Sequence, residues 1–335
     1  MEHPQRPLGG RDEREGRGSR NVNMASRIVR AVLVALSLAQ AVGGAPVRVV
    51  TTIFPLTDWA RAVGGDRVEV TQLLPPGVEA HAYAPRPRDI LALQHADLFI
   101  YLGPDMEPWA ERLATASDRP GRTVLEAARG IPRLAAEGEF HDQDPARAGD
   151  NDSLARGKSD PHVWLDPVLA QRIVTAIAAA LAQADPAGAE TYQRNAQQYN
   201  ERLEALHRRI EDTLRRAKRR EILYGGHFAF GYFARRYGLG HRSPYPGFSP
   251  NAAPTPRAVA ELIRQLRDTG QKIIFHEELV DPKVASVIAE ETGARLVLLH
   301  GAHNLSAEEA RRGDVTYLSI MEDNLRKLAE ALEAE

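Results

Sequence analysis

The 335-residue chain contains no cysteine. Disulfides, thiolate nucleophiles, cysteine-based zinc sites and a lipid-modified N-terminal cysteine are therefore excluded, and a transition-metal site must use histidine, aspartate or glutamate.

An excess of basic residues is also missing, because charged residues total 26% and the formal net charge is only -2. We therefore expect no nucleic-acid partner. Hydrophobic residues make up 43% of the chain, which suffices for a globular core, and the length suggests roughly two domains.

The apolar run near the N-terminus, 31–41, is too short to span a bilayer, which needs about 20 residues. Two arginines precede it and Ala-Gln-Ala ends it, a pattern typical of an export signal. We predict a signal peptide at 1–41, cleaved within 41–45, with Met24 as the true start and 1–23 as an upstream extension. A short membrane anchor or a buried helix is the alternative. Without this segment the chain is mildly acidic, which favours the periplasm and no stable membrane insertion after processing.

After residue 46, strand-like and helix-like segments alternate, which indicates parallel sheets covered by helices. The expected strands are 47–52, 66–74, 97–102, 221–224, 272–275 and 295–299. The expected helices are 53–63, 86–95, 167–184, 227–237, 255–268, 282–292 and 315–332, with an amphipathic segment at 106–114.

A longer helical pattern at 187–218 separates two such α/β regions. Its apolar residues recur three, four and seven positions apart, which predicts one buried stripe: Tyr192, Tyr199, Leu203, Leu206, Ile210 and Leu214. A helix of this length can run along both regions and join them stiffly. We therefore predict an α/β fold of two lobes, each with a parallel sheet flanked by helices. The expected parts are 46–185, the linking helix 186–218 and 219–335.

Four histidines follow strands or lie in loops with apolar neighbours: His81, His162, His227 and His300. Ligands of parallel sheets bind beyond the carboxyl ends of the strands, so these side chains can converge on one crevice between the lobes. The sequence therefore predicts a metal site there. His276 and His303 also lie near strand ends of the second lobe, and their role stays open.

At this point the sequence resembles the zinc/manganese-binding solute-binding proteins of bacterial ABC transporters, the ZnuA/TroA type (cluster A-I). The matching segments run in the family's order: LLPPGVEAHAYAPRPRDILALQHADLFIYLG, DPHVWLDP, GGHFAFGYFARRYGL and IIFHEELVDPKVASVIAEETGARLVLL. The resemblance implies two lobes, a rigid linking helix and delivery of a divalent metal ion to an inner-membrane ABC permease by a monomeric, non-enzymatic protein.

The resemblance also implies the ligands. His81, His162 and His227 match the family's first three ligand positions, and His300 stands where relatives commonly place an aspartate. Alternatives for the fourth ligand are Glu277, Glu278, His303 and a water molecule, with Glu277 preferred as an acceptor that orients a ligand imidazole.

A site of four imidazoles suits zinc, whereas manganese prefers carboxylate oxygens. Zinc is therefore the expected cargo, with manganese, iron or another divalent metal as the alternative. A periplasmic zinc-dependent hydrolase is the alternative from another class, because three histidines and a water would form a catalytic shell. No H-E-x-x-H motif supports it.

The segment 136–160 is rich in acidic residues and contains one histidine, His141. It occupies the place where zinc-specific relatives carry a histidine-rich loop. A solvated acidic linker and a weak scavenging site that hands metal inward are the two interpretations.

Overall fold

The structure is a computed structural model that describes residues 45–116, 119–134, 159–247 and 253–334. The expected signal peptide, Met24 and most of the acidic segment 136–160, including His141, lie outside these residues. The residues from Val47 to Glu335 form one unit.

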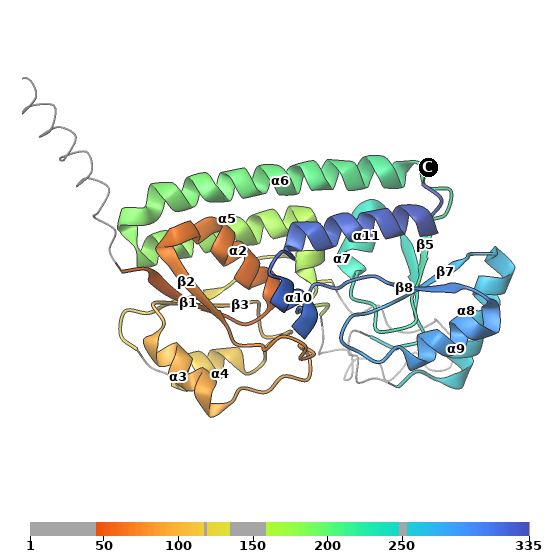
Figure 1. The fold of residues 1–335 in the computed structure, drawn as a ribbon, viewed down its shortest axis with the longest axis horizontal. Helices are drawn as coiled ribbons and strands as arrows, with labels where there is room; N and C mark the ends of the chain where they lie inside the picture. Colours follow the sequence, from red (N-terminus) through yellow and green to blue (C-terminus); the bar gives the residue numbers. More distant parts are fainter. Residues whose placement is uncertain (1–44, 117–118, 135–158, 248–252, 335) are drawn as a thin grey trace, which may run out of the picture. The chain divides into compact units, whose positions relative to one another are not determined.

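The first lobe contains a parallel sheet in the order β2-β1-β3-β4 (Figure 1). The strands are β1 (Val47–Thr51), β2 (Val68–Gln72), β3 (Leu98–Tyr101) and β4 (Thr123–Glu126). Figure 1 shows α2 (Phe54–Gly64) and α5 (Pro167–Ala184) on one face, with α3 (Pro87–His95) and α4 (Ala110–Ala116) on the other. The central strands β1 and β3 are almost entirely buried, as expected for a sheet covered on both faces.

The second lobe contains two parallel pairs, β5 (Glu221–Leu223) with β6 (Gly240–Arg242) and β7 (Ile273–His276) with β8 (Arg295–Leu298). A parallel bridge between Tyr224 and Phe275 joins β5 to β7. The helices of this lobe are α7 (Gly231–Tyr237), α8 (Pro256–Thr269), α9 (Lys283–Thr292), α10 (Ala307–Arg312) and α11 (Tyr317–Ala331). Both lobes therefore have parallel strands flanked by helices, which confirms the predicted fold class.

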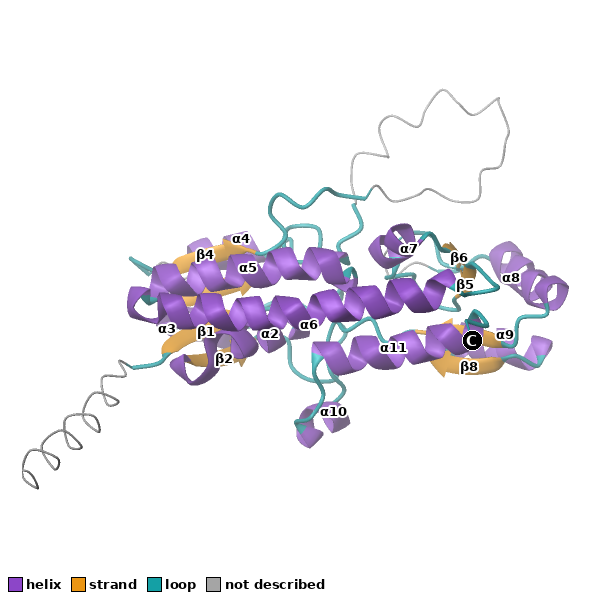
Figure 2. Cartoon of the chain, turned by 90° about the horizontal axis from the view of Figure 1, so that it is seen from above, coloured by secondary structure: helices purple, strands orange, loops and turns teal. Residues whose placement is uncertain are grey.

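The long helix α6 (Ala189–Arg215) has 27 residues and is about 40 Å long at 1.5 Å per residue. Figure 2 shows it running alongside α5 and α11, and it also packs against α2. Its buried face contains every residue of the predicted stripe, together with Ala196. The boundaries predicted at 185/186 and 218/219 remain predictions.

Helix α5 is long and apolar enough to cross a membrane by length and composition, the only such helix among the described residues. It packs along α6 and against α2, and Ile173, Val174, Ile177 and Leu181 are fully buried. Its position is therefore that of a core helix. Pro167 at its first turn and the Asp166 side chain, which accepts the N–H groups of Val168 and Leu169, define its beginning.

Short three-residue helical turns precede α6 and α5, at η4 (Pro186–Gly188) and η3 (Val163–Leu165), and a third, η1 (Gly65–Arg67), follows α2. Three short elements were not predicted from the sequence: β4, β6 and α10. The segment predicted as a helix from His227 begins as a helix only at Gly231.

Candidate metal centre

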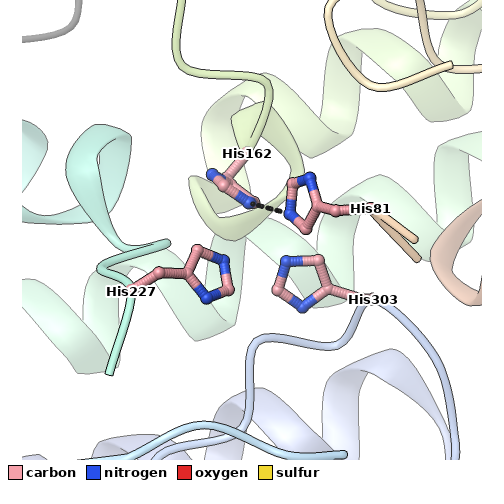
Figure 3. A group of neighbouring side chains, drawn as sticks. All are labelled: His81, His162, His227 and His303. Carbon is pink, nitrogen blue, oxygen red and sulfur yellow. Dashed lines mark hydrogen bonds between the residues drawn. The ribbon is translucent and has the colours of Figure 1, made fainter. Parts of the chain in front are cut away.

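Four imidazoles from four separate loops converge on one point (Figure 3): His81, His162, His227 and His303. One ring nitrogen of each lies within 4.8 Å of one nitrogen of every other. The ring centroids of all six pairs are 5.0 to 5.7 Å apart, so the rings surround a common centre evenly. This is the only such group of metal-binding side chains among the described residues.

The spacing fits a tetrahedral ion. Nitrogens bound to zinc at 2.0–2.1 Å in a tetrahedron are about 3.3 Å from one another. The Nε2 atoms of His81 and His162 are 3.2 Å apart. The Nε2 atoms of His227 and His303 are buried and have no hydrogen-bond partner within the described part of the chain. Buried polar atoms rarely stay unpaired, so these lone pairs are suited to an ion.

His162 lies in the loop before η3 and is fully buried. Asp160 orients it: Oδ1 lies 2.7 Å from His162 Nδ1 and accepts the His162 backbone N–H at 2.9 Å. A proton held on Nδ1 leaves the Nε2 lone pair directed at the centre. Two residues that follow His162 bond the first lobe to the second. Trp164 Nε1 donates to the Gly301 carbonyl at 2.8 Å, and Asp166 pairs with Arg236.

His227 lies in the loop between β5 and α7 and is 1% exposed. Its Nδ1 contacts the Glu277 carboxylate, and its backbone N–H donates to Glu277 Oε1 at 3.2 Å. Gly226 leaves room for this contact, since a Cβ there would lie 2.6 Å from Glu277 Oε1. Glu277 thus lies beside the His227 ring and accepts its backbone N–H, a geometry suited to orienting this imidazole.

His303 follows β8 and is 5% exposed. Glu278 holds its ring and its loop: Oε1 lies 2.9 Å from His303 Nδ1, and Oε2 accepts the Gly301 N–H at 2.7 Å. The loop bends sharply, because Ala302 has a φ of 56°, a left-handed conformation that is unfavourable for residues other than glycine. This bend brings His303 to the fourth corner of the cluster.

His300, which the sequence analysis placed at that corner, lies outside the four-nitrogen cluster. Its Nδ1 accepts the N–H of Ala302 at 2.9 Å, and its Nε2 is 3.6 Å from Glu309 Oε1 on α10. Its backbone exchanges two hydrogen bonds with the Asn324 side chain. The structure therefore places His300 as a support of the turn and His303, one of the alternatives, at the centre.

His81 is the one partly exposed member of the cluster. It lies in a turn after β2, and the Glu79 carboxylate accepts the backbone N–H groups of His81 and Ala82, both at 2.8 Å. Gly77, with a φ of 80°, allows the chain to turn there. Since the other three rings are buried, the His81 side of the cluster is the most accessible to solvent.

The charges around the rings differ between the lobes. Burial lowers the pKa of His162 well below its ordinary value, and the neighbouring His303, His81 and His227 act in the same direction. Burial also opposes protonation of His303, but the Glu278 carboxylate outweighs it and the pKa of His303 is raised. Zinc binds only unprotonated imidazole, so the lowered pKa of His162 favours its binding form, whereas the raised pKa of His303 brings this ring into competition with protons.

Sequence reasoning had assigned no role to Asp160, Trp164 or Ala302. Asp160 could have been found from its position two residues before His162, a spacing that lets one carboxylate accept both the backbone and the ring N–H of the histidine. The left-handed Ala302 has no signal in the sequence, because glycine and asparagine are the residues expected in that conformation.

The fold and the site together define a two-lobed α/β protein with four imidazoles, suited to one metal ion, at the junction of the lobes. A family model described as "Zinc-uptake complex component A periplasmic", named ZnuA, matches residues 49–331. The chain therefore belongs to the ZnuA family.

Relatives and solved structures agree with this assignment. The chain is 33% identical over 289 residues to the "High-affinity zinc uptake system protein ZnuA" of Bacillus subtilis, covering 86% of this chain and 88% of that protein. It is 31% identical over 288 residues to the "Zinc-binding lipoprotein AdcA" of Streptococcus pneumoniae, of which it spans only 56%. The crystal structure of the Zn(II)-bound ZnuA-like domain of that AdcA matches with a TM-score of 0.70 at 29% identity, covering 86% of this chain and 99% of the domain.

Proposed function

We propose that this protein binds a zinc ion outside the cytoplasmic membrane and delivers it to an ABC permease for import. The observation that carries the proposal is the closed group of four imidazoles, whose nitrogens lie within 4.8 Å of one another. The proposed ligands are His81, His162, His227 and His303. The names of the relatives, a high-affinity zinc uptake protein and a zinc-binding lipoprotein, support zinc as the cargo.

The donor atoms favour zinc over manganese. Imidazole nitrogen suits zinc, copper, nickel and iron, whereas manganese prefers carboxylate, carbonyl and water oxygens. The nearby carboxylates of Asp160, Glu277 and Glu278 are engaged behind the rings. We therefore expect zinc to bind much more tightly than manganese, and nickel, cobalt and copper(II) to be the relevant competitors.

A closed shell also favours a carrier over a hydrolase. Catalytic zinc keeps an open position for water, usually beside three protein ligands. Four imidazoles would fill a tetrahedral shell and leave no such position. We expect no turnover of ester or phosphoester substrates by the zinc-loaded protein.

The test is metal content and competition binding on the purified protein. We expect one zinc ion per chain, held against a chromogenic zinc chelator, and weak retention of manganese. Failure to retain zinc, or tighter binding of manganese, would overturn the proposal. For the location, we propose the periplasm after removal of 1–41. Cell fractionation with N-terminal sequencing of the mature protein tests this, and an unprocessed cytoplasmic protein would contradict it.

A further inference from the structure

The loop that carries His303 belongs to the second lobe by its place in the sequence. Two of its backbone carbonyls, however, accept hydrogen bonds from the first lobe. The Phe54 N–H donates to the His303 carbonyl at 3.1 Å, and the Gly77 N–H donates to the Leu305 carbonyl at 2.8 Å. These two bonds anchor the segment 303–305 beside α2 and beside the turn that precedes His81. The relative position of the two histidines therefore depends on how this segment is fixed.

Asn304, at the centre of the segment, is 1% exposed and directs its whole amide at the first lobe. Its Nδ2 donates to the Pro75 carbonyl at 2.6 Å and to the Val78 carbonyl at 3.0 Å. Its Oδ1 accepts from Gln72 Nε2, at the end of β2, at 2.8 Å. One side chain thus bonds both ends of the turn 75–78, and His81 follows three residues later.

We propose that Asn304 is a positioning residue for metal binding, which fixes His303 on one lobe against His81 on the other. The proposal rests on the proposed metal site. Asn304 is covalently next to one ligand and holds the turn that leads to another, while a metal site tolerates ligand displacements of only about 0.2 Å. Only an amide supplies two N–H donors on one side and an acceptor on the other at this size.

Loss of this amide should weaken the metal site. Groups that orient metal ligands typically contribute about 10- to 100-fold to affinity. We expect Asn304→Ala to weaken zinc binding within that range, mainly by faster zinc release, because the shell is no longer held in its closed arrangement. Asn304→Asp keeps the size of the side chain but places oxygen opposite the carbonyls of Pro75 and Val78, so it should bind zinc at least as weakly as the alanine variant.

The matched control is Asn195→Ala. Asn195 lies on α6, and its Nδ2 donates to the Val63 carbonyl at 2.9 Å, away from the cluster. Both alanine variants lose hydrogen bonds from a side-chain amide to backbone carbonyls, so both should destabilise the metal-free protein. Only the Asn304 variant should lose zinc affinity. A purely structural role for Asn304 would lower stability in denaturant without changing the zinc affinity of the folded protein.

Cobalt(II) supplies a spectroscopic measure of the shell, because tetrahedral cobalt absorbs visible light far more strongly than six-coordinate cobalt. We expect the cobalt-loaded wild-type and Asn195→Ala proteins to have the strong spectrum, and the Asn304→Ala protein to have a weaker or shifted one. If Asn304→Ala does not fold, Gln72→Ala replaces it, with an expected zinc affinity loss of about threefold to tenfold from the released amide.

The outcomes separate this inference from the proposed function. Wild-type protein that does not bind zinc would refute the proposed function. Wild-type protein that binds zinc, with Asn304→Ala equal to Asn195→Ala in affinity, release rate and cobalt spectrum, would leave the function intact and refute the role of Asn304.

Discussion

The assignment of His303, and not His300, as the fourth histidine of the cluster can be tested by replacing each of the two with alanine. The variants are His303→Ala and His300→Ala, with His207→Ala as control, since His207 lies on α6 with its Nδ1 3.0 Å from the Tyr237 hydroxyl. We expect His303→Ala to lose most of the zinc affinity, and His300→Ala and the control to keep most of it.

The magnitude follows from the number of ligands. Four-ligand zinc sites bind with about 10–16 kcal/mol, so one ligand accounts for about 2.5–4 kcal/mol. A water molecule can take the vacated corner, which leaves an expected loss of about 2–3 kcal/mol, or roughly 30- to 150-fold in affinity, for His303→Ala. His300 touches the centre only through the Ala302 N–H and Glu278, so its removal should cost less than about tenfold.

Both variants should lower the stability of the metal-free protein, so stability does not distinguish them and zinc affinity does. His300→Ala leaves the buried N–H of Ala302 without its acceptor, which costs about 1–3 kcal/mol in the free energy of unfolding. His303→Ala takes from the buried Glu278 carboxylate its 2.9 Å contact with the ring, so it should lower the free energy of unfolding by a similar amount. Zinc affinity is measured by chelator competition and stability by denaturant unfolding of metal-free protein. Equal affinity losses for the two variants, or a larger loss for His300→Ala, would refute the assignment of His303.

Further expectations concern protons, packing, the acidic segment and the lobes. Since the pKa of His303 is raised, zinc affinity should begin to fall already above pH 6.5 and continue to fall as the pH decreases; an affinity that is constant from pH 8 to 6 would contradict this. Trp164→Phe leaves the Gly301 carbonyl without its donor and should lower the free energy of unfolding by about 1–3 kcal/mol, measured in denaturant; an unchanged midpoint would contradict the bond. Deleting 138–156 should change the affinity of the cluster less than tenfold, because none of the four imidazoles comes from it; a larger loss would assign the segment to the site. Small-angle scattering should show nearly the same radius of gyration with and without zinc, because Trp164, Arg236 and Asn304 bond the lobes to each other; a large change would contradict this.

The regular elements could largely be predicted from the sequence because local signals and packing agree. The predicted bounds of α5 match the observed ones, since Asp166 and Pro167 supply the N-cap and first turn. The predicted helix 187–218 is two to three residues too long at each end, because Pro186 starts a separate short turn and α6 ends without a glycine. The strands β4 and β6 are only four and three residues long and depend on pairing partners distant in sequence.

The residues of the candidate site also fall into those that the sequence could predict and one that it could not. His81, His162 and His227 could be found because each follows a strand or lies in a distinctive motif, so sequence position alone placed them near one crevice. The fourth histidine could not, because His300 and His303 share one loop and the choice between them depends on the backbone at Ala302. A left-handed alanine is held by its surroundings, and here His300 Nδ1 accepts its N–H while Glu278 accepts that of the preceding Gly301.

The two adjacent glutamates Glu277 and Glu278 explain how the second lobe presents two imidazoles to one centre. Both follow β7, which lies between β5 and β8. Glu277 reaches His227 in the loop after β5, and Glu278 reaches His303 in the loop after β8. Two adjacent side chains at the end of β7 therefore reach the loops on both sides of this strand.

This arrangement also places the negative charge. Neutral imidazoles would bind a dication through their lone pairs, and carboxylates behind the rings would add a charge–charge attraction. Asp160, Glu277 and Glu278 each contact the Nδ1 atom of a different ring, one imidazole away from the centre. A carboxylate at that distance attracts a cation without supplying the oxygen ligand that manganese prefers. The four nitrogen donors favour a metal that accepts imidazole ligands, and the carboxylates behind the rings favour a doubly charged cation.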